Sequence, residues 1–183
     1  MKRMKKLVTL LLSLVMLCAL AMPAMAAEPT YSITITGAKG HTYTAYQIFS
    51  GVYFQGNGKN NTDANKEYLS DVQWGGDIDY TALLTELQGS ASIGTDFVDK
   101  NSAEEVADVL MKNYNDQSAK LDEFARIVGN HLKTSAVGKS GTAGADNKAT
   151  INDLSAGYYF VKDTGEIVDG EIATKFLVRV VGD

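Results

Sequence analysis

The stretch from His41 to Phe54, HTYTAYQIFSGVYF, decides the fold class of this chain. It is dense in Thr, Tyr, Ile, Phe and Val, which fit a pleated and half-buried surface, so it predicts a long β-strand. Ahead of it, Tyr31 to Thr36 alternates apolar residues with hydroxyls, as in a strand with one buried face. Gly37 ends that first strand and Lys39-Gly40 supplies a turn, so the two strands are expected to form a hairpin.

The middle of the chain changes from strand patterns to helix patterns. Residues 55–67 (QGNGKNNTDANKE) are polar and rich in Asn and Gly, as in an exposed loop, and Tyr68 to Trp74 is expected to return as a short strand. From about 78 to 133 apolar residues recur at helical spacing, beginning with a short helix over Ile78 to Leu87. This block is predicted to be a helical insertion in a β framework.

Two later helices in the block carry start signals. Ser102-Ala103-Glu104-Glu105 matches a capping box, in which the Ser hydroxyl and the Glu carboxylate each satisfy a free backbone amide. Ser118 is expected to cap the next helix, whose apolar stripe runs from Leu121 to Leu132. The stripes are too short for a coiled coil and are predicted to face a core.

Strand patterns return at the end of the chain. Residues 134–148 are mostly Gly, Ser, Ala and Lys and are predicted to be a second loop. Ala149 to Ile151 leads into the Tyr-rich strand Gly157 to Val161, and Ile172 to Val181 closes the chain. Because strands flank the helical block, the strands before it must pair with the strands after it, at long range in the sequence. The sequence therefore predicts a mainly β fold, an antiparallel β-sandwich with helices on one side or end.

The first 26 residues have the pattern of a secretory signal peptide. A basic start precedes the uncharged, Leu-rich run Leu7 to Ala21, and Ala24 and Ala26 are the small residues that a signal peptidase reads. Cleavage is expected between Ala26 and Ala27, which leaves a secreted or surface-displayed protein. The alternative is an uncleaved N-terminal anchor, for which the apolar run is short.

The composition of residues 27–183, the expected mature domain, excludes several classes of partner. The leader holds four of the 17 Lys and Arg residues, so 13 remain against 22 acidic residues, a net charge near −9. Such a chain is a poor partner for nucleic acid, or for an anionic membrane after cleavage. The only cysteine, Cys18, lies in the leader. The mature chain therefore forms no disulfide and is expected to rely on a single packed core.

Few residues point to catalysis. His41 lies beside a turn and His131 near a helix end, so both are interpreted as surface or capping residues. The polar loop Asn57 to Glu67 lacks the spacing of a calcium site, and no phosphate-binding or dinucleotide motif occurs. No cofactor and no metal are expected. Trp74, the only tryptophan, is expected in the core, and contact with a sugar ligand is the alternative.

Three segments resemble a known family. Tyr31-Ser32-Ile33-Thr34-Ile35 and Thr42-Tyr43-Thr44-Ala45-Tyr46-Gln47-Ile48-Phe49 are similar to the N-terminal domain of sortase-assembled pilus backbone proteins of Gram-positive bacteria. Leu154-Ser155-Ala156-Gly157-Tyr158-Tyr159-Phe160-Val161 is similar to the Tyr-rich strand of the collagen-adhesin B-type fold. The resemblance implies an immunoglobulin-like sandwich and an extracellular structural subunit, not an enzyme. Its partners would be other pilus or surface subunits and sortase.

Many domains of this family carry an internal isopeptide bond from a Lys on an early strand to an Asn or Asp on the last strand. Here the second strand has Gln47 where related domains have their Lys, and the closing strand has no Asn. Lys39, Lys175 and Asp183 remain as nominal candidates, but Lys39 lies in a turn and Asp183 is terminal. The reaction needs a buried Lys whose pKa is lowered, so no isopeptide bond is expected.

The sequence thus favours a structural module of a Gram-positive cell surface or fimbrium. One alternative is a secreted module that binds a host glycan or protein through the loops at 55–67 and 134–148. A less favoured alternative is a small secreted hydrolase that uses two carboxylates. No sorting signal precedes the end at Asp183, so the chain is expected to be either the first domain of a longer precursor or a secreted protein that is not attached.

Overall fold

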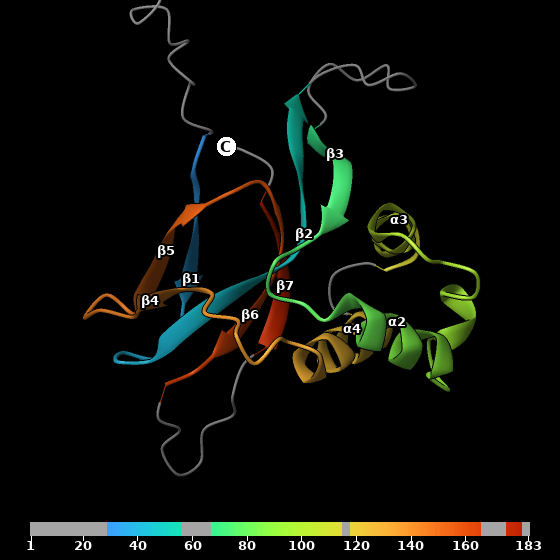
Figure 1. The fold of residues 1–183 in the computed structure, drawn as a ribbon. Coiled ribbons are helices and arrows are strands. Elements are labelled where there is room, and N and C mark those ends of the chain that lie inside the picture. The colour runs from blue at the N-terminus through green and yellow to red at the C-terminus, as the bar shows by residue number, and fades with distance from the viewer. Residues whose placement is uncertain (1–28, 56–66, 115–117, 166–174, 181–183) are drawn as a thin grey trace, which may run out of the picture.

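The computed structural model describes residues 29–55, 67–114, 118–165 and 175–180, which form a mainly β fold with antiparallel sheets and a few helices (Figure 1). The strands are β1 (Tyr31–Thr36), β2 (Thr42–Gln55), β3 (Glu67–Trp74), β4 (Lys139–Thr142), β5 (Lys148–Leu154), β6 (Gly157–Asp163) and β7 (Lys175–Val180). The helices are α2 (Tyr80–Gly89), α3 (Ala103–Asn113) and α4 (Ala119–Asn130), with a short 3-10 turn, η1 (Gly94–Asp96). These helices lie between β3 and β4, which confirms the predicted helical block at 78–133.

Strand β2 is the centre of the larger sheet. It pairs with β6 along one side, and along the other side first with β4 and then with β3. Strand β7 pairs with β6, which gives the order β3-β2-β6-β7 with β4 beside the start of β2. Strands β1 and β5 form a second sheet of two strands. The long predicted strand is confirmed, and the arrangement is compatible with a β-sandwich.

Both faces of the larger sheet are buried, each by different elements (Figure 1). Alternate residues of a strand point to opposite faces, so neighbours on β2 and β6 belong to different cores. The core toward β1 and β5 contains Ile33, Ile35, Tyr43, Ala45, Ala143, Ala149, Ile151, Leu154, Tyr159 and Val161. On the opposite face, Ile48, Phe49 and Phe160 join the core formed by the helices. A register irregularity between Gln47 and Phe49 lets two successive residues enter that helical core.

The helix starts follow the signals in the sequence. The Ser102 hydroxyl accepts from the Glu105 backbone amide at 3.2 Å, and the Glu105 carboxylate accepts from the Ser102 amide at 3.0 Å. This confirms the capping box at the start of α3. Ser118 caps α4 by accepting from the Leu121 amide at 3.1 Å, as predicted.

The first helix begins later than predicted. Helix α2 starts at Tyr80, because the Asp79 side chain caps it by accepting from the Ala82 amide. Ile78, the predicted first residue of this helix, forms an isolated antiparallel bridge with Leu132 instead. That bridge joins the segment before α2 to the segment after α4, so the helical block enters and leaves at one place.

The predicted hairpin between the first two strands is wrong. Strand β1 pairs with β5 and β2 pairs with β6, so residues 37–41 cross from the smaller sheet to the larger one. The crossing places Ile33 and Ile35 in one core with Tyr43 and Ala45, on facing sheets. Local turn residues permit either arrangement. Burial of the apolar face of β1 against a second sheet decides between them.

The predicted loop at 134–148 contains a strand. Strand β4 pairs with the first residues of β2, and the hydroxyls of Thr42 and Thr142 lie 2.9 Å apart across this pair. The hydroxyls of Thr44 and Ser140 lie 2.8 Å apart. The side chains of β4 are polar and largely exposed, so no apolar alternation marks the strand. It forms because this edge of β2 offers free backbone groups.

The described chain enters and leaves at one end of the molecule. Tyr31, the first residue of β1, is paired with Leu154, the last residue of β5. Val180, the last residue of β7, is paired with Gly157, the first residue of β6. Only residues 155–156 separate β5 from β6, so these two pairs are close together.

Candidate functional site

The residues that the sequence singled out fall in separate parts of the chain. The predicted cleavage residues Ala24, Ala26 and Ala27 lie outside the described residues, as does Asp183. Lys39 is exposed in the turn after β1, and Lys175 is the first residue of β7. The absence of an isopeptide bond stays a prediction. Trp74 ends β3 and is partly buried against the helical core.

Gln47, at the position where the resemblance to pilus proteins would place a lysine, belongs to a hydrogen-bonded chain at one end of the sheet. Its Nε2 donates to the Tyr159 hydroxyl at 3.2 Å, and that hydroxyl donates to the Ser155 carbonyl at 2.9 Å. Burial raises the pKa of Tyr159, which is 4% exposed, so the phenol stays a neutral donor. The Gln47 backbone amide donates to Asp77 Oδ2 at 2.8 Å. The last of these contacts occupies the backbone amide of Gln47, which lies between the part of β2 that pairs with β4 and the part that pairs with β3.

The surface interpretation of His41 is wrong. His41 Nδ1 lies 2.6 Å from Asp163 Oδ2, and the two residues are only 9% and 6% exposed. The other oxygen of Asp163 accepts from the Gly165 backbone amide at 2.9 Å. This pair joins the start of β2 to the end of β6 across 122 residues of sequence. No local pattern signals a contact of that range.

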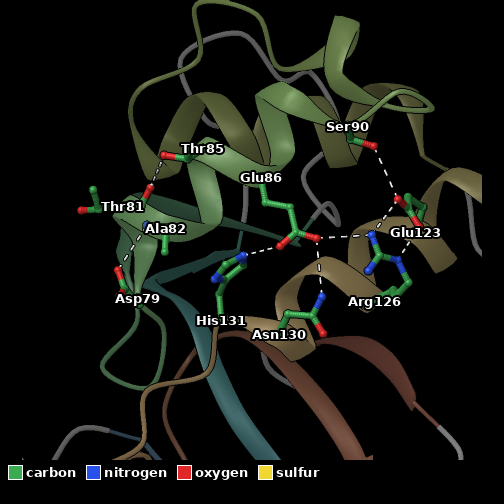
Figure 2. Close-up of polar contacts among 10 residues, drawn as sticks. All are labelled: Asp79, Thr81, Ala82, Thr85, Glu86, Ser90, Glu123, Arg126, Asn130 and His131. Atoms are coloured by element: carbon green, nitrogen blue, oxygen red, sulfur yellow. Dashed lines mark hydrogen bonds and ion pairs between the residues drawn. The ribbon is translucent and has the colours of Figure 1, made fainter.

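His131 does more than end a helix. Its Nε2 lies 2.5 Å from Oε2 of Glu86 on α2, and Arg126 on α4 lies 3.3 Å from the other oxygen of that carboxylate (Figure 2). The hydrogen bond to His131 holds the pKa of Glu86 below its ordinary value. Arg126 also pairs with Glu123 of its own helix at 2.8 Å. The network connects α2 to α4 at a partly exposed surface.

A second cluster connects η1 to the start of α4. Asp96 accepts from the Tyr114 hydroxyl at 3.0 Å and from Lys120 Nζ at 2.7 Å. The hydrogen bond from Lys120 lowers the pKa of Asp96. Burial, and then the hydrogen bond to Asp96, raises the pKa of Tyr114. The three side chains hold the ends of η1, α3 and α4 together.

These clusters act as tethers between elements. Each joins a carboxylate to a cation, an imidazole or a phenol on another part of the fold, so each carboxylate already has a hydrogen-bond or ion-pair partner within the protein. Within the described ranges, no group of three or more His, Cys, Asp or Glu is placed to hold a metal ion. Of the helices that the structure describes, none is long and apolar enough to cross a membrane.

An aromatic pair at the junction of β3 and α2 stands apart from these tethers. The rings of Trp74 and Tyr80 are stacked, with centroids 5.6 Å apart and planes 13° apart, and we call this pair the Trp74–Tyr80 stack. Trp74 also contacts the buried ring of Phe49 at 5.2 Å, whereas Tyr80 is 48% exposed. Sequence reasoning named Trp74 and missed Tyr80. The available signal was the pair of aromatics at either end of the short connection 75–79.

Comparison with known proteins does not assign a family. No family model matches the chain, and no curated protein matches it significantly. The resemblance of the three segments to pilus proteins therefore stays a hypothesis.

Proposed function

We propose that the mature domain is a structural module of a Gram-positive cell-surface or fimbrial protein, with an immunoglobulin-like sandwich of the collagen-adhesin B type. The leader is removed between Ala26 and Ala27 during export. The module is then displayed with other pilus or surface subunits, to which sortase joins it if it belongs to a longer precursor. The proposal assigns no catalytic activity and no cofactor.

The observation that carries this proposal is the long-range closure of the larger sheet. Gln47 of β2 and Tyr159 of β6 are neighbours in the sheet although 112 residues separate them. The sheet closed in this way is covered on one face by β1 and β5 and on the other by the helices. Burial on both faces supplies rigidity from apolar area, as an exported domain without a mature cysteine requires.

The position of the chain ends supports display on a surface. Tyr31 and Val180 lie at the same end of the molecule, so β1 begins and β7 ends on one side. The turns at 37–41 and 143–147 lie at the opposite end, where the Gly37 amide donates to the Asn147 carbonyl. A module attached through one end projects its other end away from the point of attachment.

The test uses the organism that encodes the chain. An antibody against the mature domain should detect ladders of high molecular mass in the cell-wall fraction that resist boiling in detergent. Deletion of the sortase gene should convert the ladders to a single band, while a membrane lipoprotein in the same fractions should not change. Cytosolic protein with an intact leader would refute export. Monomer found only in the medium would refute assembly into a polymer.

A further inference from the structure

We propose that the Trp74–Tyr80 stack is a binding platform for a neutral glycan, which lays one face of a pyranose ring on the phenol ring of Tyr80. The inference is independent of the structural role proposed above, because a surface module can present a sugar site whether or not it is polymerised.

The stack is rigid because it is supported from behind. Tyr80 is the first residue of α2, whose start is held by the Asp79 cap, and Trp74 is the last residue of β3. Behind Trp74 lies the ring of Phe49, which is fully buried and in turn meets the ring of Tyr158 edge-on at 5.8 Å. An aromatic surface that is already ordered loses little conformational entropy when a ligand binds.

The polar ends of both rings are free to meet a ligand. Neither the Tyr80 hydroxyl nor the Trp74 indole N–H has a hydrogen-bond partner among the residues that the structure describes. No buried side-chain nitrogen or oxygen in the same residues lacks a partner, so the indole N–H is not fully buried. Tyr and Trp usually pair these groups when they are buried. Here two unused polar groups lie at the edge of an exposed aromatic face.

This combination fits a sugar. A pyranose ring has a flat face of C–H groups, which packs on an aromatic ring, and a rim of hydroxyls, which both donate and accept hydrogen bonds. The exposed Lys133 reaches the connection between the two rings, where its Nζ donates to the Gly76 carbonyl at 2.9 Å and can donate further bonds. The exposed carboxylate of Asp79 adds an acceptor next to Tyr80. A protein partner would require a broader apolar surface than one tyrosine ring.

The charge around the stack selects a neutral sugar. Asp77 and Asp79 lie in the connection between the two rings, and the mature domain has a net charge near −9. An anionic sugar would meet repulsion from these carboxylates, whereas a neutral sugar would not. The alternative is that the stack only closes the connection between β3 and α2. In that case the rings would have no measurable affinity for sugars.

Trp74 provides the assay, because it is the only tryptophan in the chain and its fluorescence reports on this one site. The purified protein is titrated with maltohexaose, cellohexaose, chitohexaose and lacto-N-tetraose. Chitohexaose shares the linked N-acetylglucosamine of bacterial walls, and lacto-N-tetraose is a host-type glycan, so the preferred probe identifies the source. We expect a saturable fluorescence change with at least one probe, with a Kd between about 10 µM and 1 mM.

Two variants of Tyr80 connect the binding to the ring. Tyr80→Ala should weaken binding of that probe about tenfold or more, because truncating an aromatic contact typically has that effect. Tyr80→Phe keeps the ring but loses the hydroxyl and should lie between the wild type and Tyr80→Ala. Met111→Ala, a change at an equally exposed apolar residue on α3, should bind as the wild type does. Circular dichroism checks that each variant is folded.

Three results would overturn the proposal. The first is no saturable change with any of the four probes at concentrations up to about 10 mM. The second is a folded Tyr80→Ala variant that binds as tightly as the wild type. The third is tighter binding of sialyllactose than of any neutral probe, which would contradict the selection by charge.

Discussion

Truncation of Phe160 tests the layered arrangement directly. Its ring is fully buried in the helical core, whereas its strand neighbours Tyr159 and Val161 belong to the core toward β1 and β5. The ring packs under α4 at Gly129, where an added Cβ would lie 3.1 Å from its tip. Phe160→Ala should therefore remove one of the contacts between α4 and the sheet and leave the other core intact.

The expected cost follows from this burial. Replacing a fully buried phenylalanine by alanine costs about 3–5 kcal/mol, because the lost transfer free energy and the cavity add together. The total free energy of unfolding of a single domain is about 5–15 kcal/mol, so the variant loses a large share of it. With a urea m-value of about 2 kcal/mol/M, a loss of about 4 kcal/mol lowers the unfolding midpoint by about 2 M.

Urea unfolding of the purified protein, followed by circular dichroism, measures this loss. Val137→Ala is the control, because Val137 is 83% exposed and the change should shift the free energy of unfolding by less than about 0.5 kcal/mol. A Phe160→Ala variant within about 1 kcal/mol of the wild type would refute the reasoning, because the ring could not then be packed between the sheet and α4.

Three other experiments test the Ser102 cap of α3, the contact between His131 and Glu86, and the expected absence of an isopeptide bond. Ser102→Ala removes the cap of α3 and should cost about 1 kcal/mol in the free energy of urea unfolding; an unchanged midpoint would contradict the capping box. Because His131 lowers the pKa of Glu86 from its ordinary 4.5, their contact stabilises the fold above that pH, and this contribution is lost as the pH falls through the lowered pKa. The melting temperature of the wild type should thus fall more steeply on acidification than that of Glu86→Gln, and parallel curves would count against the contact. The intact mass of the purified protein should show no loss of ammonia or water, and a deficit of either would reveal an isopeptide bond.

The parts of the fold that sequence reasoning predicted depend on local chemistry. The Ser102 cap works because the hydroxyl and the Glu105 carboxylate reach backbone groups within one helical turn. The strand from His41 to Phe54 is similar, because its residue types favour extended backbone over nearly its whole length. The placement of the helices follows from apolar spacing within each segment. None of these features requires knowledge of what the segment packs against.

The errors arise where a partner distant in the sequence decides the structure. The turn at 37–41 suits a hairpin, yet β1 pairs with β5 because its apolar face is buried against the second sheet. Strand β4 has no apolar alternation, and it exists because the edge of β2 offers hydrogen-bonding groups. The position of His41 beside a turn predicts a surface residue, but the fold brings Asp163 to it from 122 residues away.

The sequence likewise indicates only part of the candidate glycan site. Trp74 draws attention in the sequence as the only tryptophan, but its position in β3 does not show whether the indole is enclosed. The structure adds Tyr80 on its outer side and Phe49 behind it, at the junction of a strand and a helix. The half-exposed tyrosine, and an indole N–H that has no partner among the described residues, are properties of the tertiary structure.

The sequence by itself determined the leader-like pattern of the first 26 residues, the acidic and cysteine-free composition of residues 27–183, the strands and helices with strong local signals, and their order along the chain. Periodicity, caps and composition act over a few residues, so they can be interpreted without a partner. Only the tertiary structure decided which strands pair, which face of β2 meets the helices, and which side chains stay exposed. These choices depend on burying apolar area between segments more than 100 residues apart, and no local pattern contains that information.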